Sequence, residues 1–257
     1  METRILDVDL DRHTVKLLKR TAARDTCIRV WLSCHFCISL LSSYNLDFPV
    51  DCDDEYWETD DPATAFKQPL GKPSITSYAI AYCKLIEIIG MAQRTIYEEN
   101  PKSGNDEWTK EVIANLDSAL NDWIDQVPMH LRWDPHMVDP VFATQSAVLY
   151  ACYYHVQIQI HRIFVNCPNM GLGVPVYASL AICTSSARAC SHVMDVATRK
   201  GFLTNPYLLN AVFDSALLLL LNVWGGRHVG ITVDPKKCMQ DVEMCIRVFQ
   251  VYEPRSV

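Results

Sequence analysis

The sequence predicts an all-α fold, an irregular bundle of roughly eight helices with one long acidic loop that contains prolines. Apolar residues recur at helical spacing in one segment after another. Prolines directly follow polar capping residues at several expected helix starts. The hairpin dipeptides Asn-Gly and Asp-Gly are absent, and the chain has only 9 glycines, which disfavours a sheet built from hairpins.

The apolar periodicity places the expected helices along the chain. The clearest is 107–127, which ends at Pro128 because proline cannot continue a helix. Its apolar residues fall on one stripe and we expect them in the core, with the opposite face in water. The stripe consists of Trp108, Val112, Leu116, Leu120, Trp123 and Val127, and the opposite face of Glu111, Asn115, Ser118 and Asp122. The other expected helices cover 28–41, 74–99, 142–164 and 211–224.

Several helix starts follow from local chemistry. Asp139-Pro140, Asn205-Pro206 and Asp234-Pro235 each place a side-chain acceptor before a proline. The acceptor binds backbone N–H groups that lack a helical partner, and proline at the first helical position loses no hydrogen bond. Val174-Pro175 predicts a further start without the polar cap.

The most apolar stretch, 211–224, does not predict a membrane span. It is interrupted by Asp214 and Asn222, and it is shorter than the roughly 20 apolar residues that cross a bilayer. We therefore expect a core helix that is buried on most sides.

The long irregular stretch runs from Asn45 to Pro73, and its acidic run has the composition of either a cation site or a solvated surface loop. We favour the solvated loop. We expect a charged N-terminal segment over 1–24 and a single all-α domain over 25–257. The acidic residues of the stretch are Asp47, Asp51, Asp53, Asp54, Glu55, Glu58, Asp60 and Asp61.

Charge and cysteine content exclude some classes of protein. The chain has 23 basic and 30 acidic residues, a net charge of −7, whereas a protein that binds the nucleic-acid backbone needs a basic face. Its 11 cysteines are odd in number and scattered, unlike a secreted disulfide scaffold. Residues 1–11 are charged where a signal peptide is apolar. We therefore expect a reducing compartment, the cytosol or the nucleus.

Motifs for catalysis and metal binding give no candidate residues. No nucleophile elbow, phosphate-binding loop or zinc-protease helix motif is present. The segment 34–37, Cys-His-Phe-Cys, has ligand-like spacing with Cys52 further on, but it lies in an apolar helical run and lacks a second ligand pair. Cys152, His155 and His161 lie within one expected helix, where buried cysteines and hydrogen-bonded histidines are the simpler interpretation. We predict no catalytic, cofactor-binding or metal-binding residue.

Short motifs in a characteristic order carry a family resemblance over about 29–248. The chain resembles the regulatory, or middle homology, region of the fungal binuclear zinc-cluster transcription factors, in the form seen in basidiomycete members. The motifs are Arg29-Val30-Trp31, Phe48–Glu58, Ala65–Pro69, Gly71–Ser74, Leu120–Trp123, His130–Pro135, Tyr154-His155, Ile160–Arg162, Phe164, Ala187–Cys190, Trp224–Gly226 and Asp234–Lys237.

The resemblance implies regulation of RNA polymerase II transcription in a fungal nucleus, through transcriptional co-regulators or a small-molecule inducer. It implies no enzyme activity and no membrane contact. A non-catalytic helical scaffold unrelated to transcription is the alternative, because amphipathic helices show only that faces are buried. The resemblance implies that six residues stabilise the fold and are not catalytic: Trp31, Trp57, Trp123, Trp133, His161 and Arg162.

The chain departs from the family in three ways. The family's Asp-Arg pair and Leu-Gly-Arg-Pro stretch, expected between Leu41 and Phe48, are missing. Ile163 stands where the family usually has proline, so we expect the helix to continue past Arg162. The six-cysteine DNA-binding module is also missing, as it would be in a truncated product or an incomplete gene model. Because zinc belongs to that module, we expect no zinc in this chain and DNA contact only through the missing module.

Overall fold

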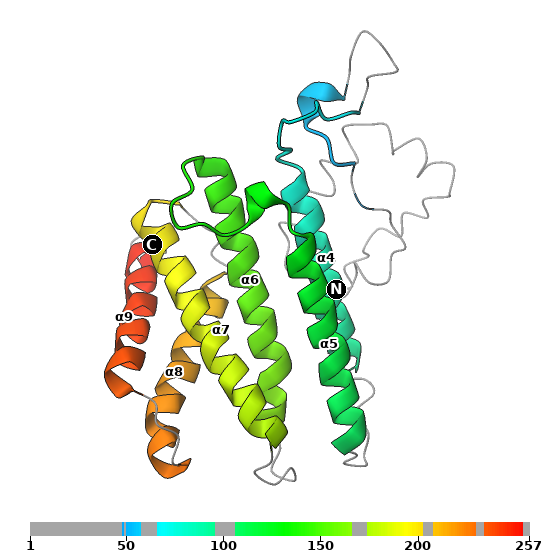
Figure 1. Cartoon of the computed structure of the whole chain (residues 1–257). Coiled ribbons are helices and arrows are strands. Elements are labelled where there is room, and N and C mark those ends of the chain that lie inside the picture. Colours follow the sequence, from blue (N-terminus) through cyan, green and yellow to red (C-terminus); the bar gives the residue numbers. More distant parts are fainter. Residues whose placement is uncertain are drawn as a thin grey trace, which may run out of the picture. The chain divides into compact units, whose positions relative to one another are not determined.

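The structure is a computed structural model (Figure 1). It describes residues 48, 50–57, 66–95, 106–165, 174–202, 208–229 and 234–253. The chain divides into two compact units, Met1–Ile80 and Ala81–Val257. The predicted N-terminal segment 1–24 and the predicted helix 28–41 lie outside the described residues, so both stay predictions.

The regular elements of the described ranges are all helical, which confirms the all-α prediction. These ranges contain six α-helices and no strand, and the expected total of roughly eight stays a prediction. No helix among the described residues has the length and apolar character needed to cross a membrane. The elements are η2 (Asp54–Tyr56), α4 (Ser77–Gln93), α5 (Asp106–Gln126), η4 (Met129–Leu131), α6 (Pro140–Val165), α7 (Val174–Arg199), α8 (Leu209–Val229) and α9 (Pro235–Tyr252).

Helix α5 follows its predicted pattern closely. It covers Asp106–Gln126, within one residue of the prediction at either end. The stripe residues Val112, Leu116, Leu120, Trp123 and Val127 are buried. The predicted wet face is exposed, and its members are Glu111, Asn115, Ser118 and Asp122.

The proline-linked starts are confirmed where the structure describes them. The Asp139 carboxylate accepts hydrogen bonds from the backbone N–H groups of Val141 (2.8 Å) and Phe142 (3.1 Å) at the start of α6. Asp234 accepts from Lys236 N (3.0 Å) at the start of α9, with proline in the first turn. These bonds satisfy donors that have no partner inside the helix. Asn205-Pro206 lies outside the described residues, and α7 begins at Val174 as expected.

The end of α7 is fixed by a glycine whose role the sequence analysis did not anticipate. Gly201 has φ of +74°, a conformation that costs an L side chain about 1–2 kcal/mol. Its N–H donates to Thr198 O (3.0 Å), and Phe202 N donates to Ala197 O (2.9 Å). This pair of bonds is the Schellman motif, and Phe202 also packs against the cluster that contains Ala197.

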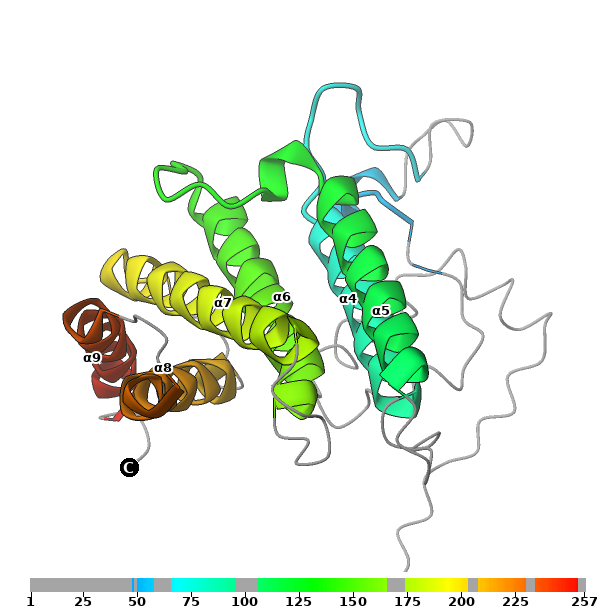
Figure 2. The same ribbon diagram turned by 60° about the horizontal axis from the view of Figure 1, so that its bottom comes forward.

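The second unit is built around α6 and α7. Helix α6 packs against α5, α7 and α8, and α9 packs against both α7 and α8. Figures 1 and 2 show α6 beside α7, and the part of α4 after Ala81 beside α5. One core cluster draws on four helices, with Ile158 from α6, Ala187 from α7, Leu219 from α8 and the pair Cys238 and Val242 from α9.

Helix α8 differs from its prediction on one side. Ala211, Val212 and Leu219 are buried, as expected for a core helix. The other side is exposed, because α6, α7 and α9 cover only the inner face. The large apolar residues of this outer side are Phe213, Leu217, Leu220, Leu221 and Trp224.

Candidate functional site

Helix α6 carries the two histidines of the family-like motif, and the first to consider is His161, which joins three helices. Its Nε2 lies 3.0 Å from Asp117 Oδ1 on α5, and its Nδ1 lies 3.2 Å from Ser179 Oγ on α7. The His161 side chain is 1% exposed. Because a carboxylate only accepts hydrogen bonds, Nε2 carries a proton toward Asp117, and in the neutral ring Nδ1 accepts from the Ser179 hydroxyl.

An Asp–His–Ser series of this kind invites comparison with a hydrolytic triad, but the burial argues against that chemistry. A serine nucleophile has to reach a substrate carbonyl, and its base has to sit beside an open site. Ser179 is 2% exposed and His161 is fully buried. The three residues form a hydrogen-bonded tie between α5, α6 and α7.

The second histidine, His155, belongs to a polar cluster between α6 and α8. Asp214 Oδ2 lies 3.0 Å from His155 Nε2 and accepts from Gln159 Nε2 (3.1 Å). Arg162 Nη1 approaches the same oxygen at 3.5 Å. The hydrogen bond from His155 is the largest influence on the pKa of Asp214; burial opposes it, and the charges of His155 and Arg162 add to it, so this pKa lies below its usual value.

Arg162 thus has a partner on another helix as well as its place near a helix end. Helix α6 continues to Val165, so it passes Ile163 as the departure from the family pattern predicted. Arg162 remains in the last turn, where a cation complements the helix dipole.

Two buried carboxylates link α7 and α9 reciprocally. Asp195 of α7 lies 3.0 Å from Arg247 Nη2 of α9 and 2.6 Å from Arg199 Nη2 of its own helix. Asp241 of α9 lies 3.2 Å from both Arg188 Nε and His192 Nε2 of α7. Their side chains are only 2% and 3% exposed. Each buried negative charge is therefore compensated from the facing helix, as burial of a carboxylate requires.

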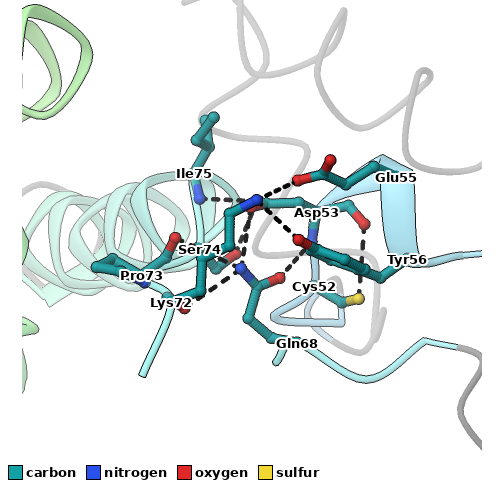
Figure 3. A network of polar contacts seen from close by, with 9 residues as sticks. All are labelled: Cys52, Asp53, Glu55, Tyr56, Gln68, Lys72, Pro73, Ser74 and Ile75. Atoms are coloured by element: carbon teal, nitrogen blue, oxygen red, sulfur yellow. Dashed lines mark hydrogen bonds and ion pairs between the residues drawn. The ribbon is translucent and has the colours of Figure 1, made fainter. Parts of the chain in front are cut away.

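In the first unit, Asp53 is the centre of a polar network (Figure 3). Its carboxylate accepts hydrogen bonds from Ile75 N (2.7 Å), Gln68 Nε2 (3.0 Å) and Ser74 Oγ (3.1 Å). Asp53 N in turn donates to Gln68 Oε1 (2.9 Å). The network fixes the chain just ahead of α4, where Thr76 Oγ1 also donates to Cys52 O (3.1 Å).

Asp53 corrects the prediction of a wholly solvated acidic run. It is 8% exposed, whereas Asp51, Asp54 and Glu55 are exposed. Burial alone raises the pKa of the Asp53 carboxyl, but the bonds from Gln68, Ile75 and Ser74 outweigh it and leave this pKa below its usual value. The part of 45–73 outside the described residues leaves the single long loop as a prediction.

The cysteines that the sequence predicts to be core residues are buried wherever the structure describes them. Cys52, Cys83, Cys152, Cys183 and Cys190 are buried free thiols. Burial raises the pKa of Cys152 to about 12 and that of Cys190 to about 11, so both stay protonated and unreactive near neutral pH. The segment 34–37 lies outside the described residues, and within the described ones no cluster of three or more His, Cys, Asp or Glu side chains is placed to hold a metal ion.

The tryptophans predicted as anchors differ in burial. Trp123 is 4% exposed, donates from Nε1 to Ala81 O (2.8 Å) and stacks on Tyr153 with 5.5 Å between ring centroids. Trp133 is half-buried and packs against a cluster of α6 and α7. Trp57 is half-buried in the first unit, and Trp31 lies outside the described residues.

The structure brings together residues that the sequence analysis did not single out. Asp117, Ser179, Asp195 and Asp241 carry the interhelical contacts, and only the Asp195–Arg199 pair had a local signal, the four-residue spacing of an ion pair along a helix. The polar clusters join helices and contain no exposed nucleophile beside a base.

Comparison with curated proteins gives two partial matches. An uncharacterized transcriptional regulatory protein of Schizosaccharomyces pombe is 23% identical over 194 residues, which is 72% of this chain and 25% of that protein. The chain is similar to fungal transcriptional regulators. The transcriptional activator protein acu-15 of Neurospora crassa is 28% identical over 120 residues, 45% of this chain and 12% of that protein. The chain thus spans a quarter or less of the length of these relatives. No family model and no solved structure matches the chain.

Proposed function

We propose that this chain is the regulatory domain of a fungal RNA polymerase II transcription factor. The similarity to two fungal transcriptional regulators carries the proposal. The fold is consistent with it, because helices joined by buried polar ties can be biased between packing arrangements by a partner or a small molecule. In this proposal the domain works in the nucleus, without catalysis and without a cofactor, and its partners are transcriptional co-regulators or an inducer.

A reporter experiment tests the regulatory role. The chain is inserted between a heterologous DNA-binding domain and a strong activation domain in a fungal cell. We expect it to change reporter output several-fold relative to an unrelated helical domain of similar length. A variant carrying both Leu116→Ala and Trp123→Ala, which removes two buried side chains of α5, should lose the effect because the domain no longer folds.

The reporter experiment also separates the two candidate functions. If the intact chain and the unrelated domain give the same output at equal expression, the regulatory role is wrong. A non-catalytic scaffold unrelated to transcription would then account better for the helical fold.

A second prediction concerns nucleic acid. Because these 257 residues carry a net charge of −7 and contain no six-cysteine motif, the purified 257-residue chain should show no sequence-specific duplex binding at physiological salt. A gel-shift titration with a promoter fragment and a scrambled fragment measures this. Nanomolar affinity for the promoter over the scrambled duplex would contradict the prediction.

A further inference from the structure

Helices α7 and α9 carry a net charge of the opposite sign to the rest of the chain. Together they contain five basic and three acidic residues, a net charge of +2. The rest of the chain has 18 of the 23 basic and 27 of the 30 acidic residues, a net charge of −9. Two of the three acids, Asp195 and Asp241, are buried, so Glu243 is the one exposed acidic residue of these two helices. The surface of α7 and α9 is therefore basic.

The basic side chains form a strip along the line where α7 and α9 meet. Arg188, His192 and Arg199 follow one another on α7 at intervals of four and seven residues, which keeps them on one face of the helix. Arg247 of α9 joins them, because it contacts the same carboxylate as Arg199, that of Asp195. We refer to the four basic residues as the α7/α9 strip, and their side chains are 30%, 55%, 64% and 48% exposed in the order named.

Buried carboxylates hold the arginines of the strip from beneath. Asp241 lies 3.2 Å from Arg188 Nε. Asp195 lies 3.0 Å from Arg247 Nη2 and 2.6 Å from Arg199 Nη2. An exposed arginine ordinarily loses side-chain freedom when it binds a ligand, and this loss weakens the binding. Because these arginines are already held by the fold, they lose less on binding.

The arginines also keep hydrogen-bond donors that the fold does not use. Within the described part of the chain, Nη1 of Arg188, Arg199 and Arg247 has no acceptor. A guanidinium group has five N–H donors in a planar fork, and this fork matches the two oxygens of a carboxylate. The strip thus offers oriented donors together with positive charge, the combination that recognises carboxylates.

The dimensions of the strip favour a short acidic protein segment over nucleic acid. Arg188 and Arg199 are 11 residues apart, which is about 17 Å along a helix. An extended peptide covers this distance in about five residues. A nucleic-acid duplex would continue past the strip, over a chain whose other residues carry a net charge of −9, and would be repelled there.

We propose that the α7/α9 strip binds an acidic segment of another protein in extended form, with carboxylates at alternate positions. Alternate side chains of an extended segment lie on the same side, about 7 Å apart. Arg188 and His192 are about 6 Å apart along α7, so consecutive carboxylates of this series meet consecutive residues of the strip. The contact is solvent-exposed, so it is weak and sensitive to salt. It does not depend on the transcriptional role proposed above, so this proposal and the reporter experiment can fail separately.

Fluorescence anisotropy with two labelled peptides of about ten residues tests the interaction. One peptide alternates glutamate with serine, and the other alternates glutamine with serine. With the full 257-residue chain in about 50 mM salt, we expect the glutamate peptide to bind with a Kd of roughly 10–300 µM. The glutamine peptide should bind at least roughly tenfold more weakly. An increase to about 300 mM salt should weaken binding of the glutamate peptide at least roughly fivefold.

Two double variants locate the binding surface. Arg199→Gln with Lys237→Gln removes one charge from the strip and one from an exposed position of α9 a turn before Asp241. This variant should bind the glutamate peptide at least roughly fivefold more weakly. The matched control, Arg94→Gln with Lys110→Gln, removes the same two charges from exposed positions outside α7 and α9. It should change the Kd less than about twofold, because only the net charge of the chain differs.

Both double variants are expected to fold, since Arg247 still compensates Asp195 when Arg199 is replaced, and circular dichroism checks this. Equal binding of the two peptides, or an equal loss in the two double variants, would overturn the proposal. A strand of six thymidine nucleotides carries about as many charges as the glutamate peptide. If it bound more tightly than the peptide, the strip would be a nucleic-acid surface and the proposal would be wrong.

Discussion

Removing both arginines around Asp195 should destabilise the protein by about 3–5 kcal/mol, because a buried carboxylate then loses its compensating charges. Asp195 is 2% exposed, and Arg247 contacts it with both Nε and Nη2 at 3.0 Å. Replacement of Arg199 and Arg247 by methionine keeps most of the alkyl stem, which limits the loss of packing. Urea titration of the double variant measures the change.

Two further variants separate charge from packing in this prediction. Lys237→Met removes an exposed positive charge from α9 and should change the free energy of unfolding by no more than about 0.5 kcal/mol. Adding Asp195→Asn to the double methionine variant should recover a large part of the loss, because the uncompensated charge is gone. A loss below about 1 kcal/mol in the double variant would show that water reaches Asp195.

Local signals account for what the sequence predicted well. The α5 stripe and the caps at Asp139 and Asp234 depend on residues within a few positions of one another, so spacing alone determines them. The continuation of α6 past Ile163 has the same local origin, since only proline would have interrupted the helix.

Long-range pairs account for what the sequence did not predict. His155 and Asp214 are 59 positions apart, and Asp195 and Arg247 are 52 apart. A helical pattern shows that a face is buried but not which residue meets it. The burial of Asp53 has the same cause, because its partner Gln68 lies 15 residues further along the chain.

Helix α8 shows that the burial of apolar residues, too, cannot be predicted from the local sequence alone. Its composition predicted burial, and its inner face contributes Leu219 to the core. The number of neighbouring helices available to cover the outer face is a property of the whole fold, and α6, α7 and α9 all lie on the inner side. Phe213 and Leu217 therefore remain exposed.

The second large effect is expected at Leu116 on α5. Its side chain is 2% exposed and lies on the stripe with Leu120 and Trp123. Leu116→Ala removes three buried carbon atoms and leaves a partial cavity, because the surrounding side chains relax only in part. We expect a loss of about 2–5 kcal/mol in the free energy of unfolding, measured by denaturant titration.

Ser118 on the same helix provides the matched control for Leu116. It is exposed, so Ser118→Ala should change the free energy of unfolding by no more than about 0.5 kcal/mol. Against a typical total of about 5–15 kcal/mol, only the Leu116 variant should shift the unfolding midpoint clearly. If Leu116→Ala left the midpoint unchanged and instead abolished binding of a partner protein, the α5 stripe would be an interaction surface. Trp123 of the stripe stacks on Tyr153 of α6, and α5 packs against α6, so the α5 stripe belongs to the core.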